Sequence, residues 1–486
     1  MINTEALKRK IVDLAVTGEL TESSSGDANK ELERIINKLN SNTSKVKEDD
    51  FWAVIPRSWA WAKLSNLTTT ETLNDGDWVL SVDMVPQGEV KLIQLGSIGD
   101  CVFKNSGFKY LTKNHFDELN GKQIYPGYLL VNRLVMNRMA SCIVPELDGV
   151  LMTAVDVCWI APNDEAYNIK YIMYALSSSG FQKKVNSLGR GVTRFRISKL
   201  NLIEIPFPLP PREEQDRIIK KIDELFSLTD KMEKLKLKYN ADAEVLKSKI
   251  IDASIQGKLT EQLYEDGNAE DLLAEIQAEK KRLYEEGKIP KDKKLPSIPK
   301  ADEPFKIPNS WKWTRIQDVA SYITDYVANG SFATLKEHTK TYKEKNYAVF
   351  VRTMDLGAGF KEECSYIDKE SYEFLHKSKL FGGELILPNI GASIGKVFIM
   401  PDLGMPMSLA PNSILLKFVD PVMNEYFSLV FKSSYGSALL NKSQGGSATA
   451  KFSKTDLRAM AVPVPPIEEQ KRIVDITNML LEELTN

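Results

Sequence analysis

The stretch LKRKIVDLAVTGELTE at Leu7–Glu22 returns as LKSKIIDASIQGKLTE at Leu246–Glu261, with nine of sixteen positions identical at an offset of 239 residues. Two further blocks are repeated in the same order: IPRSWAW at 55–61 as IPNSWKW at 307–313, and PLPPREEQDRI at 208–218 as PVPPIEEQKRI at 463–473. Three matched blocks in one order indicate an internal repeat of about half the chain. The sequences between the blocks diverge, which predicts one repeated frame that holds two different globular inserts.

The central copy of the frame predicts a long helix. Two prolines and two glutamates within 210–214 are typical of a helix start, and apolar residues then recur every three or four positions. The pattern reaches about Ile255, with Gly257 as a stop, so some 40 residues would span roughly 60 Å. A second helix is expected at 269–286. We expect the apolar stripe to pack against another arm or to bind a partner through Ile218, Ile222, Leu225, Met232, Leu246, Ile250 and Ile473.

The two termini supply a partner for this helix. Segment 467–484 matches the first part of the central helix and segment 6–22 matches its last part, so the termini laid end to start nearly reproduce it, about eight residues shorter. The predicted fold class is therefore α+β. We expect two mixed α/β globular domains, separated by two long antiparallel helical arms in a pseudo-twofold circular arrangement.

The repeats also set the expected domain boundaries. The globular domains are predicted at 51–210 and 307–465, the central arm at 211–287, a Lys- and Pro-rich linker at 288–306, and the halves of the terminal arm at 1–40 and 466–486. Within the globular domains, apolar runs predict strands at 127–135, 382–387, 395–400 and 412–418, and short helices at 167–176 and 424–432.

Composition limits the classes of function. A net charge of −2 and a pI near 6.2 argue against a small free-standing DNA-binding domain, but they allow local basic faces. The four cysteines and three histidines are scattered, which predicts no metal site and suits a reducing cytoplasm. The N-terminus lacks the pattern of a signal peptide, and no apolar run predicts a membrane span, so we expect a cytoplasmic protein without membrane contact.

No catalytic residue and no cofactor of its own are predicted for this chain. Its nearest approach to a phosphate-binding loop, GASIGKV at 391–397, is one residue short and lacks the closing Ser or Thr. A glycine-rich dinucleotide fingerprint, the Asn/Asp-Pro-Pro-aromatic tetrad of amino-methyltransferases and a convincing acid–lysine cluster for a metal-dependent nuclease are not found.

Two loops at equivalent places are the main binding candidates. SLGRGVTRFRISK at 187–199 and KSQGGSATAKFSK at 442–454 both combine glycine, small hydroxyls and cations, and each precedes a PPxEEQ block. Such loops can approach and neutralise DNA phosphates, and arginine can also read guanine. The alternative is a solvated surface turn whose Ser-Lys pair caps the next element. The candidate DNA-binding residues are Arg190, Arg194, Arg196, Lys199, Lys442, Lys451 and Lys454.

Position suggests different roles for these cations. Lys199 and Lys454 are equivalent, which favours contact with the component common to all DNA, its phosphates. Arg190 and Arg194 lack cationic counterparts at an offset of 255 and are better candidates for base recognition particular to the first half. Weaker candidates for DNA contact, for which a surface ion pair is the alternative, are Arg133, Arg138 and Arg352.

The repeated PPxEEQ helix start, the LK-K-I-D block and the W-x-W entry resemble Type I restriction–modification specificity subunits over essentially the whole chain. The resemblance implies two target-recognition domains that each recognise one half of a split double-stranded DNA site. It also implies docking of two modification subunits, which use S-adenosylmethionine, and of restriction subunits that translocate DNA and use ATP and Mg²⁺. The shorter terminal arm is a departure that puts symmetric docking in doubt.

Two other classes of function remain open. A single-chain methyltransferase or nuclease would need a cofactor or metal motif. A coiled-coil adaptor for proteins would not need two diverged globular inserts with matching cationic loops. The sequence does not reveal which bases are recognised or the length of the spacer between half-sites.

Overall fold

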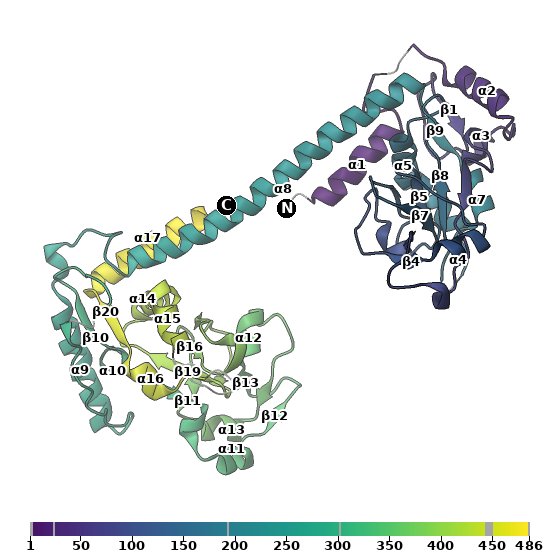
Figure 1. Cartoon of the computed structure of the whole chain (residues 1–486). Coiled ribbons are helices and arrows are strands. Elements are labelled where there is room, and N and C mark those ends of the chain that lie inside the picture. Colours follow the sequence, from purple (N-terminus) through teal and green to yellow (C-terminus); the bar gives the residue numbers. More distant parts are fainter. Residues whose placement is uncertain (1–2, 23–24, 192–193, 301–302, 443–450, 485–486) are drawn as a thin grey trace. The chain divides into compact units, whose positions relative to one another are not determined.

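The computed structural model describes residues 3–22, 25–191, 194–300, 303–442 and 451–484 (Figure 1). The chain divides into two compact units, Met1–Leu237 (unit 1) and Lys238–Asn486 (unit 2). The helix α8 (Arg212–Ser254) contributes residues to both units. Within the described ranges, no helix is both long enough and apolar enough to cross a membrane.

Unit 1 is built from short strands covered by helices. Besides the first part of α8, its helices are α1 (Thr4–Val16), α2 (Ala28–Leu39), α3 (Leu64–Leu67), α4 (Lys113–Glu118), α5 (Ile169–Ser177), α6 (Ser179–Leu188) and α7 (Lys199–Glu204). Its strands are β1 (Ala60–Ala62), β2 (Leu73–Asp75), β3 (Val90–Ile93), β4 (Lys109–Leu111), β5 (Leu129–Asn132), β6 (Ser141–Ile143), β7 (Val150–Thr153), β8 (Val157–Ile160) and β9 (Phe207–Leu209).

Unit 2 has the same kinds of element. Its helices are α9 (Ala269–Glu285), α10 (Ile316–Val319), α11 (Phe332–His338), α12 (Thr353–Ala358), α13 (Lys369–Phe374), α14 (Pro421–Lys432), α15 (Ser434–Lys442), α16 (Lys454–Ala459) and α17 (Ile467–Glu483). Its strands are β10 (Lys312–Arg315), β11 (Tyr322–Asp325), β12 (Thr341–Tyr342), β13 (Ala348–Val351), β14 (Tyr366–Ile367), β15 (Lys379–Leu380), β16 (Leu385–Pro388), β17 (Phe398–Ile399), β18 (Met407–Leu409), β19 (Ser413–Lys417) and β20 (Ala461–Val464).

The two units share one sheet plan. Each has a four-stranded antiparallel sheet, in the order β2-β8-β5-β6 in unit 1 and β11-β19-β16-β17 in unit 2. Each also has a second sheet with one parallel pair, β3 with β7 and β13 with β18, and a separate two-stranded pair, β1 with β9 and β10 with β20. The central strands β5 and β16 are largely buried, which is why their sequences are continuous apolar runs.

The repeated blocks meet in each unit. In unit 1, Gly18 has a φ of +83°, and a Cβ at this position would overlap the ring of Pro56 and contact Trp59. In unit 2, Gly257 makes the same turn against Pro308 and Trp311. The first and second blocks are therefore repeated together, because the tight packing of the turn leaves no room for a side chain.

The third block closes this junction. In unit 2, Glu469 is fully buried, and its carboxylate accepts hydrogen bonds from Trp311 Nε1 (2.8 Å), Thr260 Oγ1 (2.8 Å) and Gln262 Nε2 (2.9 Å). Its counterpart in unit 1, Glu214, is also fully buried. The second tryptophan of each W-x-W motif lies opposite a proline of the third block across the two-stranded pair, as Trp313 does with Pro463.

The aspartate of the first block has a structural task of its own. The Asp13 carboxylate accepts hydrogen bonds from Ser179 N and Ser179 Oγ, both at 2.7 Å, and so satisfies free backbone and side-chain donors at the start of α6. Asp252 does the same for Ser434 N at 2.7 Å, at the start of α15. The repeat thus preserves a cap as well as a packing contact.

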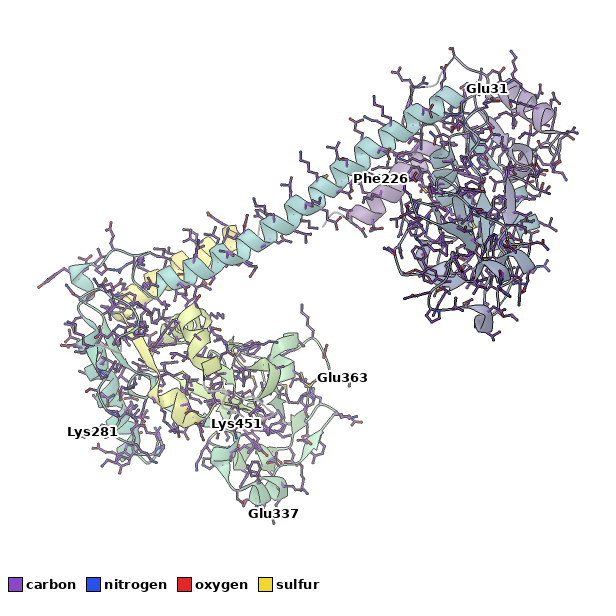
Figure 2. All side chains as sticks on the ribbon, viewed as in Figure 1. Glu31, Phe226, Lys281, Glu337, Glu363 and Lys451 are labelled. Carbon is purple, nitrogen blue, oxygen red and sulfur yellow. The ribbon has the colours of Figure 1, made fainter. Side chains whose placement is uncertain are left out.

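The two terminal arm helices, α1 and α17, pack in different units. The α1 side chains Ile11 and Val12 join the core of unit 1 with α8 residues, and Lys8 pairs with Asp230 and lies 5.5 Å from the ring centre of Phe226, which Figure 2 labels. In unit 2, Ile473 of α17 joins a core that also contains Ile255, the residue after the end of α8, and Ile251 of α8 packs against this core. Among the seven expected stripe residues, Ile218, Ile222 and Ile473 are buried, Leu225 and Ile250 are half-buried, and Met232 and Leu246 are exposed.

The predicted α+β class, with two mixed units and a long helix, is confirmed. The central helix ends at Ser254, one residue before the expected limit, and the second helix occupies Ala269–Glu285. The strands expected at 127–135, 382–387, 395–400 and 412–418 correspond to β5, β16, β17 and β19. The short helices expected at 167–176 and 424–432 correspond to α5 and α14. The two arms themselves are represented by α8 and by the terminal helices α1 and α17.

Two aromatic side chains pack against the second tryptophan in each unit, Phe51 and Trp52 in unit 1 and Phe305 and Tyr435 in unit 2. The one that also donates a hydrogen bond to a backbone carbonyl comes from a different segment in each unit. In unit 1, Trp52 packs edge-on against Trp61 and donates from Nε1 to the Pro206 carbonyl at 2.9 Å. In unit 2, Tyr435 packs against Trp313 and donates from its hydroxyl to the Ala461 carbonyl at 2.9 Å. The position equivalent to Tyr435 in unit 1 is Gly180, and a Cβ there would overlap the Trp52 ring.

This exchange predicts a strong coupling between Gly180 and Trp52. Gly180→Ala should destabilise unit 1 by about 2 kcal/mol, because the added methyl overpacks the indole, although alanine is by itself the better helix former within α6. Urea denaturation followed by tryptophan fluorescence measures the loss. In a Trp52→Ala background, the same Gly180→Ala change should become neutral or stabilising.

The matched control is Gly357→Ala in α12, where no atom lies within 4 Å of the added Cβ. It should leave stability unchanged or slightly improved. Equal losses from Gly180→Ala with and without Trp52 would contradict the overpacking explanation.

Candidate nucleic-acid interface

The cationic loop of unit 1 contains a tight turn. Arg190 and Arg196 exchange two backbone hydrogen bonds, each of 2.9 Å, and the side chains of Arg190, Arg194 and Arg196 are exposed. Gly191 has a φ of +113°, and a Cβ there would overlap the Arg194 carbonyl. Residues 192–193 lie outside the described ranges. Arg190 and Arg194 have no carboxylate within ion-pair distance among the described residues, whereas Arg196 lies 3.5 Å from Asp156.

This turn is attached to a second loop that follows the central strand β5. Val135 N donates to the Phe195 carbonyl (2.8 Å), and Ile197 N donates to the Arg133 carbonyl (3.0 Å). A further bridge joins Leu134 to Arg196. Segments more than fifty residues apart in the sequence therefore form one surface, which joins the Arg190–Arg196 turn to the β5–β6 loop, residues 133–140.

Arg133 lies beneath that surface. Its side chain is 8% exposed, and it donates to the carbonyls of Ile197 (3.1 Å) and Val155 (2.7 Å) and pairs with Asp75 at 2.9 Å. Burial raises the pKa of the neighbouring Cys158 thiol to about 12, so this thiol adds no charge near pH 7. These contacts give Arg133 a structural role, and its expected contact with DNA stays a prediction.

The other two weaker candidates are also held by internal contacts. Arg138 donates to the Ser177 carbonyl and lies 3.5 Å from Asp100, which fixes the far end of the β5–β6 loop. Arg352 in unit 2 forms a capping pair with Asp355 at the start of α12, with atoms 2.6 Å apart. The Asp355 carboxylate raises the pKa of Arg352. DNA contact by either arginine remains untested.

Unit 2 repeats the arrangement with other side chains. Lys451, labelled in Figure 2, is exposed and bridges to Ile390, as Arg196 bridges to Leu134. Asn389 takes the place of Arg133. Asn389 Nδ2 donates to the Phe452 carbonyl, and Phe452 N donates to the Asn389 carbonyl, both at 3.1 Å. Residues 443–450 and the side chain of Lys442 lie outside the described part of the chain.

The two equivalent lysines bind equivalent acceptors inside their own units. Lys199 begins α7 after the cap Ser198, and its Nζ donates to Asn74 Oδ1 on β2 at 2.9 Å. Lys454 begins α16 after the cap Ser453, and its Nζ pairs with Asp325 on β11 at 2.7 Å. These contacts support the structural alternative for the Ser-Lys pairs, and phosphate contact by the lysines stays a prediction.

Sequence reasoning did not single out the most exposed apolar side chain on this surface. Met136 is 90% exposed at the tip of the β5–β6 loop, and Asn137 beside it is also exposed. The available signal was VNRLVMNRM at 131–139, in which an apolar residue and an amide stand between two arginines in the segment that links two strands. At the equivalent positions of unit 2, Ala392 is exposed and Ser393, which follows it, is half-buried.

Comparisons with known proteins agree with this duplicated arrangement. A family model described as the Type I restriction modification DNA specificity domain matches residues 143–239 and 308–486, more than half of the chain. The EcoEI specificity subunit of a Type I restriction enzyme from Escherichia coli is 22% identical over 531 residues, which cover 96% of this chain and 87% of that protein. The EcoAI specificity subunit from the same species is 23% identical over 384 residues, covering 68% of this chain but only 64% of the relative.

Solved structures share the fold. The HsdS subunit from Thermoanaerobacter tengcongensis superposes with a TM-score of 0.54 at 17% identity, covering 89% of this chain and 91% of that chain. A chain from a structural study of complex assembly in the type I R-M system superposes with a TM-score of 0.55 at 17% identity, covering 88% and 91%. At this identity the likeness concerns the fold alone.

The buried and exposed arginines of unit 1 should respond differently to the same substitution. Arg133→Met should destabilise unit 1 by about 3 kcal/mol, because it leaves Asp75 and two carbonyls without a partner. Arg194→Met should change stability by less than about 0.5 kcal/mol, because this side chain is exposed. Urea denaturation compares the two. An Arg133→Met protein as stable as the wild type would contradict the structural role.

Proposed function

The chain belongs to the family of the Type I restriction modification DNA specificity domain, and we propose that it is the subunit that recognises a bipartite, gapped DNA site for a Type I restriction–modification complex. In this proposal, unit 1 and unit 2 each recognise one half-site in double-stranded DNA. The relatives named above are specificity subunits. Their names support the same role for this chain.

The observation that carries the proposal is a common frame that presents different side chains. Equivalent backbone bridges hold Arg196 in unit 1 and Lys451 in unit 2, so a cation is kept at this place. At the neighbouring exposed loop position, Met136 in unit 1 corresponds to Ala392 in unit 2. A cation that both units keep suits contact with DNA phosphates, which carry no sequence information. A neighbouring position that differs between the units suits contact with the bases.

Chemistry is assigned to partner subunits in this proposal, and the chain itself is non-catalytic. Two modification subunits would bind S-adenosylmethionine, and restriction subunits would use ATP and Mg²⁺ to move along and cleave DNA. The arm helices would dock these subunits through apolar side chains that the units leave uncovered. Met232 and Leu246 on α8 are each 44% exposed and support this assignment.

Exchange of one recognition block tests the modular reading of DNA. Replacing residues 51–208 with the corresponding block of another family member should alter one half of the methylated site. The other half and the spacer should stay unchanged, because the repeated frame is retained. Methylome sequencing of a strain that carries the exchanged chain and the modification subunits reports the result. A change in both half-sites would contradict separate recognition.

The matched control changes α8 instead of the block. Inserting one helical turn between Ile218 and Ile250 should alter the spacer and leave both half-sites unchanged, since α8 is continuous through both units. If the insertion changed the recognised bases while the spacer stayed the same, α8 would not set the spacing.

Substitutions at two positions on α8 should distinguish a residue needed for folding from a residue that binds partner subunits. Ile222→Asp should lower the free energy of unfolding by several kcal/mol, because Ile222 is fully buried and the carboxylate would be unpaired. Met232→Asp should leave unfolding nearly unchanged but weaken association with the modification subunits by about tenfold or more, since Met232 is exposed.

Thermal melting and titration with purified modification subunits measure these two effects. Met232→Leu serves as the control and should bind those subunits as the wild type does. Normal association of the Met232→Asp chain would remove this part of α8 from the docking surface.

A further inference from the structure

The β5–β6 loop of unit 1 displays a highly exposed methionine. Met136 is 90% exposed, whereas its neighbours Val135 and Met139 are 3% and 1% exposed. A scattered exposed apolar residue is common on protein surfaces and needs no explanation by itself. The anchoring of this loop distinguishes Met136.

The loop is held at both ends by specific hydrogen bonds. On the side of β5, Val135 N donates to the Phe195 carbonyl at 2.8 Å, and the buried Arg133 bridges to Ile197. On the side of β6, Met139 N donates to Gln182 Oε1 at 2.9 Å, and Gln182 Nε2 donates back to the Met139 carbonyl at 3.0 Å. The loop therefore presents Met136 from a fixed backbone, which suits a recognition residue.

Its surroundings point to one chemical class of ligand. The attached turn exposes Arg190, Arg194 and Arg196, and Asn137 is exposed next to Met136. Arginine pairs with guanine and asparagine with adenine in the major groove, where the apolar feature of the base edges is the C5-methyl group of thymine. An apolar side chain displayed among such residues matches that methyl group.

Building on the proposed function, we infer that Met136 is a specificity-determining residue that contacts the C5-methyl of a thymine in the half-site recognised by unit 1. The equivalent residue in unit 2, Ala392, is too short to make the same contact. The methyl contact therefore belongs to one half-site. Arg190 and Arg194 supply attraction to DNA beside it, and Arg133 positions the loop from below.

The test removes the methyl group from DNA and the thioether from the protein. Duplexes bound by the full-length chain are first selected from a randomised library. Each thymine of the selected site is then replaced in turn by deoxyuridine, which lacks only the C5-methyl. Fluorescence anisotropy measures the dissociation constant of every duplex for the wild type, Met136→Ala, Met136→Leu and Val54→Ala. Val54 is a matched control because it is 92% exposed outside the loop.

The wild type should show one thymine in one half-site at which deoxyuridine weakens binding about fourfold, the factor expected for one buried methyl-sized group. Met136→Ala should bind the unmodified site about fourfold more weakly and be insensitive to deoxyuridine at that thymine. Met136→Leu should keep the sensitivity, and Val54→Ala should behave as the wild type.

Three results would overturn the inference while leaving the proposed function intact: no effect of Met136→Ala, an equal loss on all sequences, or a loss that is coupled to no thymine methyl. The last result would indicate a side chain that wedges between base pairs. If the full-length chain selected no sequence from the library, the proposed function itself would fail.

Discussion

The packing of a left-handed glycine turn against a proline and a tryptophan is the contact on which both units depend. Gly18 meets Pro56 and Trp59 in unit 1, and Gly257 makes the same turn in unit 2. No side chain fits between these groups, so the arm helix must enter each globular unit at one place. The buried Glu469 then joins the third block to this junction in unit 2 by accepting three hydrogen bonds. A buried carboxylate is tolerated only when its hydrogen bonds are made, which ties all three repeated blocks to one another.

Around this junction the chain can vary as long as its contacts are replaced. Trp52 in unit 1 and Tyr435 in unit 2 come from unrelated segments, yet each covers a tryptophan and donates to a carbonyl at the same place. Arg133 and Asn389 likewise differ, yet both hold the loop after the central strand. The geometry of the loop is thus maintained by different side chains in the two units. In the proposed function, this would leave the exposed positions beside the loop free to differ with the DNA that is recognised.

The sequence was sufficient for features that depend on periodicity and repetition. The limits of α8 and α9 and the strands β5 and β19 lay within a few residues of their expected positions, because one-sided burial leaves a pattern along the chain. It was insufficient where a role depends on partners distant in the chain. Arg133 and Arg194 look alike in the sequence, but only the first meets Asp75 and two carbonyls. Met136 gave no periodic signal, since its exposure follows from the anchoring of its neighbours.

The net charge of the chain is −2, so its overall charge does not attract DNA. Such a chain has no long-range excess of positive charge, so attraction must come from local groups within about one Debye length of the phosphates. Lys454 is partly neutralised by Asp325, and Lys199 already donates to Asn74. Arg190 and Arg194 lack such neighbours among the described residues. Their positive potential is therefore concentrated beside the β5–β6 loop. In the proposed function, this potential would draw DNA to unit 1 and bring its base edges to the residues that differ between the two units.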